Sequence, residues 1–403
     1  MKELELYVHI PFCMKKCLYC DFLSAPADEK SQSAYMDGLK RELAWYGKTL
    51  HGRRLKSVYI GGGTPSWMQE AYMEDLMKEI RRRFPLAEDA EITIECNPGT
   101  LTKNKLLLYR QLGVNRLSIG LQSADNAELK LLGRVHTYEQ FLRNYELARE
   151  CGFDNINVDL MDSLPGQTLE TFYQTLQKTV RLGPEHLSCY SLIIEEGTPF
   201  YDRYKFDVVK RHAGMQTEEL PTEDAVYQIG KMTQDFLAEH GYVQYEISNY
   251  AKEGYACRHN IGYWQREEYL GVGLGASSLL HNVRYSNLRD LNAYVEKSLH
   301  IVQESVLYEA TGKEIPCSSL HEKVQALSKQ DCMEEFMFLG LRMTQGVEKS
   351  RFYREFGYTV DFVYGDVMRS LREEGMLAET SSHVYLTEKG MDLNNYAAAQ
   401  FLL

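Results

Sequence analysis

The first half of the chain alternates short apolar, β-branched runs with stretches of helical periodicity. Between residues 33 and 48, Tyr35, Leu39, Leu43 and Tyr46 recur every three to four positions and would share one helix face. The expected strands are Leu4–Ile10, Leu55–Ile60, Glu91–Cys96, Arg116–Gly120, Asn155–Asp159 and Leu187–Leu192. The expected helices are Ser33–Lys48, Trp67–Phe84, Thr102–Leu112, Phe141–Cys151 and Leu169–Leu182. Such strand–helix repeats predict parallel strands, because each crossover helix returns the chain to the same end of the sheet.

These six units predict an α/β fold built as an open, partial (β/α)6 barrel, since they are too few to close a complete (β/α) barrel. In such folds the chemistry lies at the carboxyl ends of the strands. The distinctive segments Pro11–Phe22, Gly61–Ser66 and Asn97–Pro98, together with Gln122, directly follow the first four expected strands. Candidate functional residues should therefore gather at one end of the barrel.

The second half follows a different pattern. Glu195–Pro221 is polar and is expected to be a loop, and Thr222–His240 is expected to be a helix capped by Thr222. Tyr242–Tyr250 is predicted to be a strand, followed by an irregular stretch to about Arg284.

The last part of the chain predicts a small α+β domain of winged-helix type. Its expected elements are helices Asp331–Met343, Lys349–Phe356 and Val360–Glu374, a β-hairpin near Met376–Leu386, and a final helix. The resulting domain boundaries are 1–220 for the barrel, 221–325 for an extension of it, and 326–403 for the C-terminal domain. This last segment is not strongly basic, which favours a packing or lid role over DNA binding.

Composition excludes some classes of function. The 403 residues carry a net charge of −12, which argues against a nucleic-acid or anionic-membrane surface. No run is long and apolar enough for a membrane span, and the first residues do not have the layout of a signal peptide, so a cytoplasmic protein is expected. Its nine cysteines are then expected to be reduced, buried or metal-bound.

Three of these cysteines, Cys13, Cys17 and Cys20, lie in one loop with the spacing C-x3-C-x2-C. Thiolates select iron–sulfur clusters, zinc or Cu(I), and three thiolates on a [4Fe–4S] cluster leave one iron without a protein ligand. A zinc site completed by His9 or by a remote cysteine is the alternative. The other cysteines are expected to be small buried residues: Cys96, Cys151, Cys189, Cys257, Cys317 and Cys332.

Two further features surround the triplet. Tyr19 immediately precedes the last cysteine, and Gly61-Gly-Gly-Thr-Pro65 follows the second expected strand. In this register the chain resembles the radical S-adenosylmethionine (radical SAM) superfamily. The resemblance implies a [4Fe–4S] cluster on Cys13, Cys17 and Cys20, with S-adenosylmethionine chelating the vacant iron. A turn without side chains would let backbone carbonyls approach the amino group of that cofactor.

Nearly the whole chain is similar to the coproporphyrinogen III oxidase-like branch of that superfamily. The shared segments are Tyr7-Val-His-Ile-Pro-Phe-Cys13, Glu95-Cys-Asn-Pro98, Gly120-Leu-Gln-Ser123, Gly133-Arg-Val-His136 and Asp159-Leu-Met-Asp-Ser-Leu-Pro-Gly166. By this resemblance the contacts to S-adenosylmethionine are Tyr7, Gly62, Gly63, Thr64, Glu95, Gln122, Arg134 and Asp159. Arg134 suits the carboxylate of the cofactor, and Glu95 or Asp159 suits its ribose hydroxyls.

The branch contains oxygen-independent oxidases, which decarboxylate propionates of coproporphyrinogen III, and chaperones, which bind heme and deliver it to respiratory hemoproteins. The oxidases carry a fourth cysteine where Phe22 stands here, and an N-terminal arm before the first strand, which begins here near residue 4. His259-Asn-Ile-Gly-Tyr-Trp264 matches a motif of the chaperones. The resemblance therefore favours a heme chaperone, with the oxidase or another radical SAM enzyme as the alternative.

On this interpretation His259 is the candidate heme ligand, and Tyr263 and Trp264 would cover a porphyrin face. Cys257 is an alternative ligand, and a purely structural role for His259 is also open. The partners are heme and hemoprotein acceptors, with no nucleic acid and no integral membrane segment. The sequence leaves open radical turnover and assembly as a homodimer. Gly271–Ser278 is excluded as a dinucleotide-binding turn because its third glycine is misplaced and no helical repeat follows.

Overall fold

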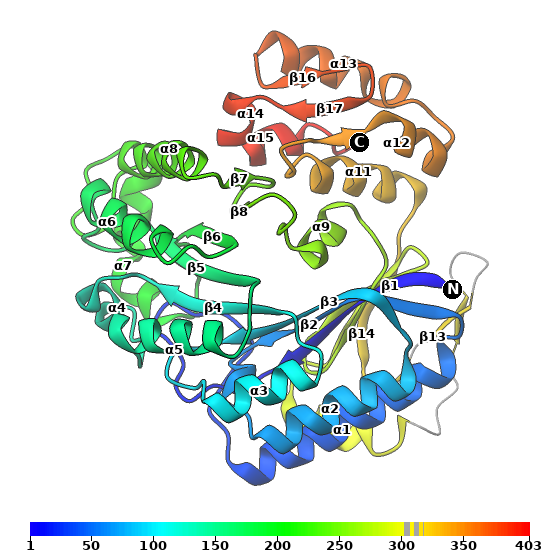
Figure 1. Cartoon of the computed structure of the whole chain (residues 1–403). Coiled ribbons are helices and arrows are strands. Elements are labelled where there is room, and N and C mark those ends of the chain that lie inside the picture. Colours follow the sequence, from blue (N-terminus) through cyan, green and yellow to red (C-terminus); the bar gives the residue numbers. More distant parts are fainter. Residues whose placement is uncertain (302–306, 310–313, 317) are drawn as a thin grey trace.

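The computed structural model describes residues 1–301, 307–309, 314–316 and 318–403, so the prediction for Cys317 lies outside the described residues. Figure 1 shows a strongly curved sheet with helices on its outer side and the C-terminal elements packed across one end. Helix α9 lies on the inner side of the curve.

Six parallel strands form the centre of the sheet in the order of the sequence, as predicted. They are β1 (Lys2–Ile10), β2 (Arg53–Gly62), β3 (Leu86–Cys96), β4 (Arg116–Gln122), β5 (Ile156–Asp162) and β6 (His186–Ser191). The helices between them are α1 (Glu29–Thr49), α2 (Glu70–Arg83), α3 (Lys103–Gln111), α4 (Asn126–Leu131), α5 (Tyr138–Glu150) and α6 (Leu169–Val180). Of these helices, only α4 was not expected from the pattern.

The barrel is open because its two outermost strands pair with other elements. β1 pairs with β9 (Tyr269–Val272), and β6 pairs with β8 (Asn249–Ala251). The predicted fold class, an α/β open partial barrel with a small C-terminal domain, is therefore confirmed.

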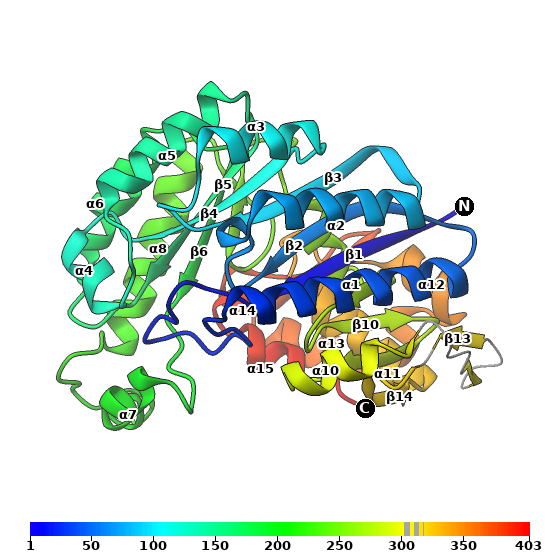
Figure 2. The same ribbon diagram turned by 90° about the horizontal axis from the view of Figure 1, so that it is seen from below.

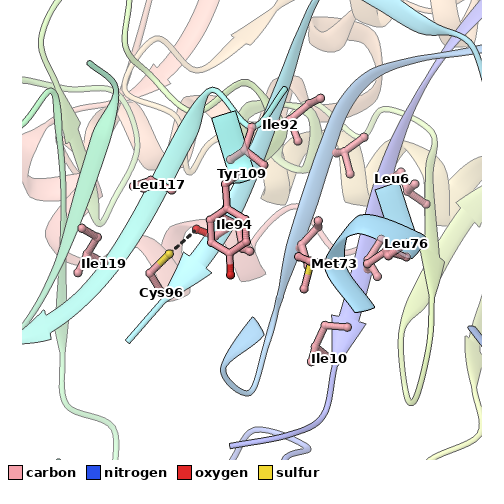
Figure 3. Packing of buried hydrophobic residues seen from close by; sticks show 14 of the residues in the cluster. Leu6, Ile10, Met73, Leu76, Ile92, Ile94, Cys96, Tyr109, Leu117 and Ile119 are labelled. Carbon is pink, nitrogen blue, oxygen red and sulfur yellow. Dashed lines mark hydrogen bonds between the residues drawn. The ribbon is translucent and has the colours of Figure 1, made fainter. Parts of the chain in front are cut away.

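Alternating side chains of the strands divide the barrel into an apolar outer face and a polar inner face. Figure 3 shows Leu6 and Ile10 of β1 with Met73 and Leu76 of α2, in the buried layer beneath the helices. The alternate residues of β1, Glu5, Tyr7 and His9, belong to the opposite face. Apolar burial on the outer side thus holds the strands, while the inner side remains available for polar groups.

The region after β6 departs from the sequence-based expectation in two places. The segment expected to be a loop contains helix α7 (Pro199–His212), which Thr198 caps and which buries Phe200 and Tyr204. Figure 2 shows α7 apart from the barrel helices, near the loop that follows β1. This helix was not predicted because its sequence is mostly polar and only two of its aromatic residues, Phe200 and Tyr204, are buried.

The stretch expected to be irregular to about Arg284 is also ordered: it contains α9 (Arg258–Trp264), β9, β10 (Ser277–Leu280) and the start of β11 (Val283–Asn287). After it come α10 (Leu291–Ser298) and β14 (His321–Ala326), with β12 (Leu307–Glu309) and β13 (Glu314–Pro316) forming a separate pair. Strands β10, β11 and β14 extend the sheet beyond β9, so the irregular-loop prediction was wrong. The strand expected over 242–250 is two short ones, β7 (Val243–Gln244) and β8. Helix α8 (Glu223–Glu239) begins at the predicted cap, Thr222.

The C-terminal region contains the predicted helices and hairpin. Its elements are α11 (Lys329–Gly340), β15 (Val347–Glu348), α12 (Lys349–Phe356), α13 (Val360–Glu373), β16 (Leu377–Glu379), β17 (His383–Leu386), α14 (Glu388–Asp392) and α15 (Asn394–Ala399). A separate apolar cluster from Leu327 to Phe401 holds them together and includes Leu279 of β10. The predicted domain boundaries remain a prediction. Among the described helices, none has the length and apolar character needed to cross a membrane.

Candidate functional site

The cysteine loop joins β1 to α1, and backbone hydrogen bonds close it at its base. The N–H of Cys13 donates to the carbonyl of Ala25 (3.3 Å), and the N–H of Ala25 donates to that of Pro11 (3.0 Å). The middle of the loop is held from outside, since the N–H of Leu18 donates to Leu132 (3.1 Å) and its carbonyl accepts from Phe200 at the start of α7 (3.1 Å). The loop is thus fixed by both the barrel and α7.

The three thiols in this loop are free, as are the other five cysteines of the described ranges. Burial raises the pKa of Cys13 and of Cys20, and the neighbouring cysteines add to that effect. Bound metal reverses this tendency, because a coordinated thiol is deprotonated. Cys13 is buried, and Cys17 and Cys20 are half-buried. Three thiolates in one short loop are a suitable donor set for an iron–sulfur cluster.

The alternative of a zinc ion completed by His9 finds no support in its contacts. His9 Nδ1 is hydrogen-bonded to the Tyr7 hydroxyl (2.9 Å), and its Nε2 to the carbonyl of Leu23 (2.9 Å). Within the described part of the chain, no three His, Cys, Asp or Glu side chains are gathered closely enough to hold one metal ion. A four-iron cluster spreads its three thiolates over three different irons, more widely than a single ion does.

The glycine-rich turn after β2 lies directly against the cysteine loop. Gly63 N–H donates to the carbonyl of Ile10 (2.8 Å), and Thr64 N–H donates to that of Phe12 (2.7 Å). Gly62 has a φ of +113°, and a Cβ there would lie 2.5 Å from His9 Cε1. A Cβ on Gly63 would lie 2.5 Å from the Phe12 carbonyl oxygen. Only glycine permits these approaches, which bring the two sequence motifs side by side.

Glu95 connects this turn to the inner face of the barrel. Its Oε2 accepts from the N–H of Gly62 (2.9 Å), and its Oε1 accepts from the hydroxyl of Tyr59 (3.0 Å). Burial raises the pKa of Glu95 to about 7. A carboxyl that titrates near neutrality at the carboxyl end of a barrel strand is a candidate ligand-binding group.

The other predicted contacts to S-adenosylmethionine lie on β4 and β5 and next to them. Arg134 Nη2 donates to the Gly120 carbonyl (2.7 Å), and Nη1 lies 3.7 Å from Cys17 Sγ. Asp159 accepts hydrogen bonds from Ser118 Oγ (3.0 Å) and Asn157 Nδ2 (2.8 Å), and burial raises its pKa. Gln122 has a φ of +72°, an unusual conformation for a residue with a side chain. Arg134 Nε is buried without a hydrogen-bond partner among the described residues, so this guanidinium retains a donor.

His259 lies in α9, inside the barrel, and is only 1% exposed. Its Nδ1 is hydrogen-bonded to Ser57 Oγ (2.8 Å) and its Nε2 to the Tyr263 hydroxyl (3.0 Å). The ring stacks on Tyr59, with centroids 5.2 Å apart. Burial lowers the pKa of His259 to about 3, which keeps the imidazole neutral. Neutral imidazole is the form that binds metals, although ligation through Nε2 would require the Tyr263 hydroxyl to turn away.

A cavity of about 570 Å³ lies between α9, the inner face of β1 and β2, and the β9–β10 turn. Cavities of roughly 300–1,000 Å³ hold cofactor-sized ligands. Its lining includes aromatic side chains from four elements, namely Tyr7, Tyr59, Tyr263, Trp264 and Tyr269. Tyr7, predicted to contact S-adenosylmethionine, and His259, the predicted heme ligand, therefore both line this cavity.

Glu91 on β3 holds α9 in place, and the sequence did not reveal this role. Its carboxylate accepts the backbone N–H of Arg258 (3.0 Å) and of His259 (3.1 Å), and the thiol of Cys257 lies 3.4 Å from it. The buried Cys257 is therefore a partner of Glu91. Cys96, Cys189 and Cys332 are buried as predicted, and Cys151 is half-buried.

The chain is similar to known proteins over its whole length. A model of the radical SAM superfamily matches residues 7–179, and one of the HemN C-terminal domain matches residues 327–393. A Lactococcus lactis protein named heme chaperone HemW is 35% identical over 402 residues, covering 100% of this chain and 98% of that protein. Escherichia coli heme chaperone HemW is 42% identical over 277 residues, covering 68% of this chain and 70% of that protein.

Among solved structures, coproporphyrinogen III oxidase (HemN) from Escherichia coli has a TM-score of 0.80 at 24% identity. The match covers 100% of this chain and 90% of that one, and it shows a shared fold. The fold, the cysteine loop and the superfamily match define a protein of the radical SAM class. Within that class, the chain belongs to the HemW family.

Proposed function

We propose that this chain is a heme chaperone that delivers heme to respiratory hemoproteins. In this proposal Cys13, Cys17 and Cys20 hold a [4Fe–4S] cluster, and heme occupies the cavity beside His259. The observation that carries the proposal is the shared cavity, whose lining joins Tyr7 to His259. The full-length similarity to proteins named heme chaperone HemW supports it.

S-adenosylmethionine would lie between the cysteine loop and the inner face of the barrel. Gly62, Gly63 and Thr64 would offer it backbone groups, and Tyr7, Glu95, Gln122, Arg134 and Asp159 would offer side chains. When bound, the cluster and S-adenosylmethionine together supply one-electron radical chemistry. The protein's own part is to orient these groups and to exclude water from them.

Heme titration of the anaerobic protein tests the proposal. We expect a Soret band that saturates with heme and that is lost or shifted in His259→Ala, because the variant lacks the imidazole ligand. His240→Ala serves as the matched control, since His240 caps α8 outside the cavity and should leave the band unchanged. A band identical in wild type and His259→Ala would remove His259 from the proposal.

An enzymatic assay separates the chaperone from the oxidase. The protein would be incubated anaerobically with coproporphyrinogen III, S-adenosylmethionine and a reductant. The proposal predicts that no protoporphyrinogen forms, whereas its formation would contradict a role limited to heme delivery.

Glu95 should make the binding of S-adenosylmethionine depend on pH. Its raised pKa of about 7 means that the carboxyl is protonated below neutrality and ionised above it. An ionised carboxylate is the stronger hydrogen-bond acceptor, so affinity should rise with pH and level off above about pH 7, by at most about tenfold per unit. Calorimetric titration between pH 6 and 8 should show this rise in wild type and a flat profile in Glu95→Gln. A rise of the same size in both proteins would exclude Glu95 as its cause.

A further inference from the structure

The cavity beside His259 carries an uneven set of charges. The described residues that line it include two arginines, Arg266 and Arg284, but no aspartate or glutamate. The two histidines of the lining, His9 and His259, have pKa values lowered by burial and are neutral near pH 7. Among the described lining residues the formal charges are therefore both positive, which favours a ligand with an anionic group.

The two arginines differ in how many of their hydrogen-bond donors already have a partner in the protein. Arg266 is 3% exposed and donates to Glu335 Oε2 (3.0 Å), Glu355 Oε1 (3.2 Å) and Asn282 Oδ1 (2.9 Å). These contacts engage all three of its nitrogens. Arg266 therefore joins the barrel extension to the C-terminal helices and has little left to offer a ligand.

Arg284 is 35% exposed and bonds through Nη1 to the same Glu335. Glu335 is thus shared by the two guanidinium groups, and Arg266 has a second carboxylate partner in Glu355. A guanidinium carries five N–H donors in a planar fork, so Arg284 retains donors on its exposed side. Tyr269, which also lines the cavity, is a second side-chain partner of Arg284.

We propose that Arg284 binds a carboxylate of the ligand that occupies this cavity. This inference rests on the proposed function, under which the carboxylate is a propionate of heme. The aromatic side chains of the lining face the apolar ring of such a ligand, and Arg284 pairs with its charged edge. Arginine suits this role because its fork matches a carboxylate in a bidentate manner. Arg284 is then a specificity residue that selects porphyrins with free acid groups.

The test compares iron protoporphyrin with its dimethyl ester, which has the same ring but no charged carboxylates. Soret titrations would be made anaerobically on wild type, Arg284→Gln, Arg284→Lys and Arg54→Gln. Arg54 is the matched control, because it is 41% exposed and pairs with Glu3 outside the cavity. We expect Arg284→Gln to weaken binding of the free acid about ten- to hundredfold and binding of the ester less than about twofold. Arg284→Lys should recover part of the loss, and Arg54→Gln should match wild type.

Each other outcome has a definite meaning. Equal loss for acid and ester would show that Arg284 supports the fold of the cavity and would overturn the inference, as would no loss for either. If Arg284→Gln weakens only S-adenosylmethionine binding, its partner is the carboxylate of that cofactor, and the heme assignment is overturned. A wild-type protein that binds neither porphyrin would overturn the proposed function and this inference with it, whereas binding that ignores Arg284 would overturn only the inference.

Discussion

Replacing Cys13, Cys17 or Cys20 with alanine is expected to abolish the iron–sulfur cluster. On the proposed assignment each thiolate would hold a different iron, and the loop supplies no fourth cysteine that could substitute, because Phe22 stands two residues after Cys20. After anaerobic reconstitution, we expect about four irons per chain in wild type and fewer than roughly one in each variant. Iron and sulfide analysis, together with the visible absorption of the cluster, measures this directly.

Cys151→Ala is the matched control for these three variants. Cys151 is a half-buried free thiol at the end of α5, far from the cysteine loop in the sequence. The Cys151→Ala protein should bind as much iron per chain as wild type. A single variant of the triplet that keeps its full iron content would contradict the assignment of that cysteine, and loss of iron in Cys151→Ala would show that the measurement reports folding instead.

Gly262→Ala is expected to destabilise the protein through the contact between α9 and β1. A Cβ at Gly262 would lie 1.9 Å from Oε1 of Glu5, whose side chain is fully buried and pairs with Lys56 Nζ at 3.0 Å. Movement of this buried carboxylate away from the new Cβ would weaken its ion pair with Lys56. Overpacking of this kind costs about 1–3 kcal/mol. The midpoint of denaturant unfolding, followed by circular dichroism, should fall accordingly.

Gly230→Ala provides the opposite case within the same chain. Gly230 lies in the middle of α8, is exposed, and would place its Cβ in open space. Alanine there should raise the free energy of unfolding by about 0.5–1 kcal/mol, because it restricts the unfolded chain and favours helix. If both variants shift the midpoint in the same direction by the same amount, the close approach of Gly262 to Glu5 does not limit stability.

The barrel could be predicted from the sequence because its signals are local. Helices such as α1 repeat apolar residues on one face, and the strand ends coincide with turns. The sheet extension through β9, β10 and β11 escaped prediction because these strands are short and joined by tight turns, at Gly273 and Gly275 and then at His281 and Asn282. Helix α7 escaped it because most of its surface is polar and only two aromatics are buried.

In the candidate site, too, local motifs could be predicted from the sequence and long-range contacts could not. The cysteine triplet and the Gly61–Pro65 turn are compact motifs that can be recognised in the sequence, although the spacing of the triplet also allows zinc. Glu91, in contrast, supports α9 across 166 to 168 positions of sequence, and Glu5 meets Gly262 from the first strand. Contacts of such long range leave no periodicity or spacing in the sequence. The enclosure of His259 between Ser57 and Tyr263 likewise required the structure.

On the proposed assignment, the thiolates of Cys13, Cys17 and Cys20 would leave one iron of the cluster open to S-adenosylmethionine. Electron paramagnetic resonance of the reduced cluster, recorded with and without S-adenosylmethionine, reports on this open iron. Direct binding of the amino group and carboxylate to the open iron should change the g-values of the signal. A reduced cluster whose spectrum is identical in both samples, or native protein that contains zinc in place of iron, would rule out an open iron on this cysteine loop.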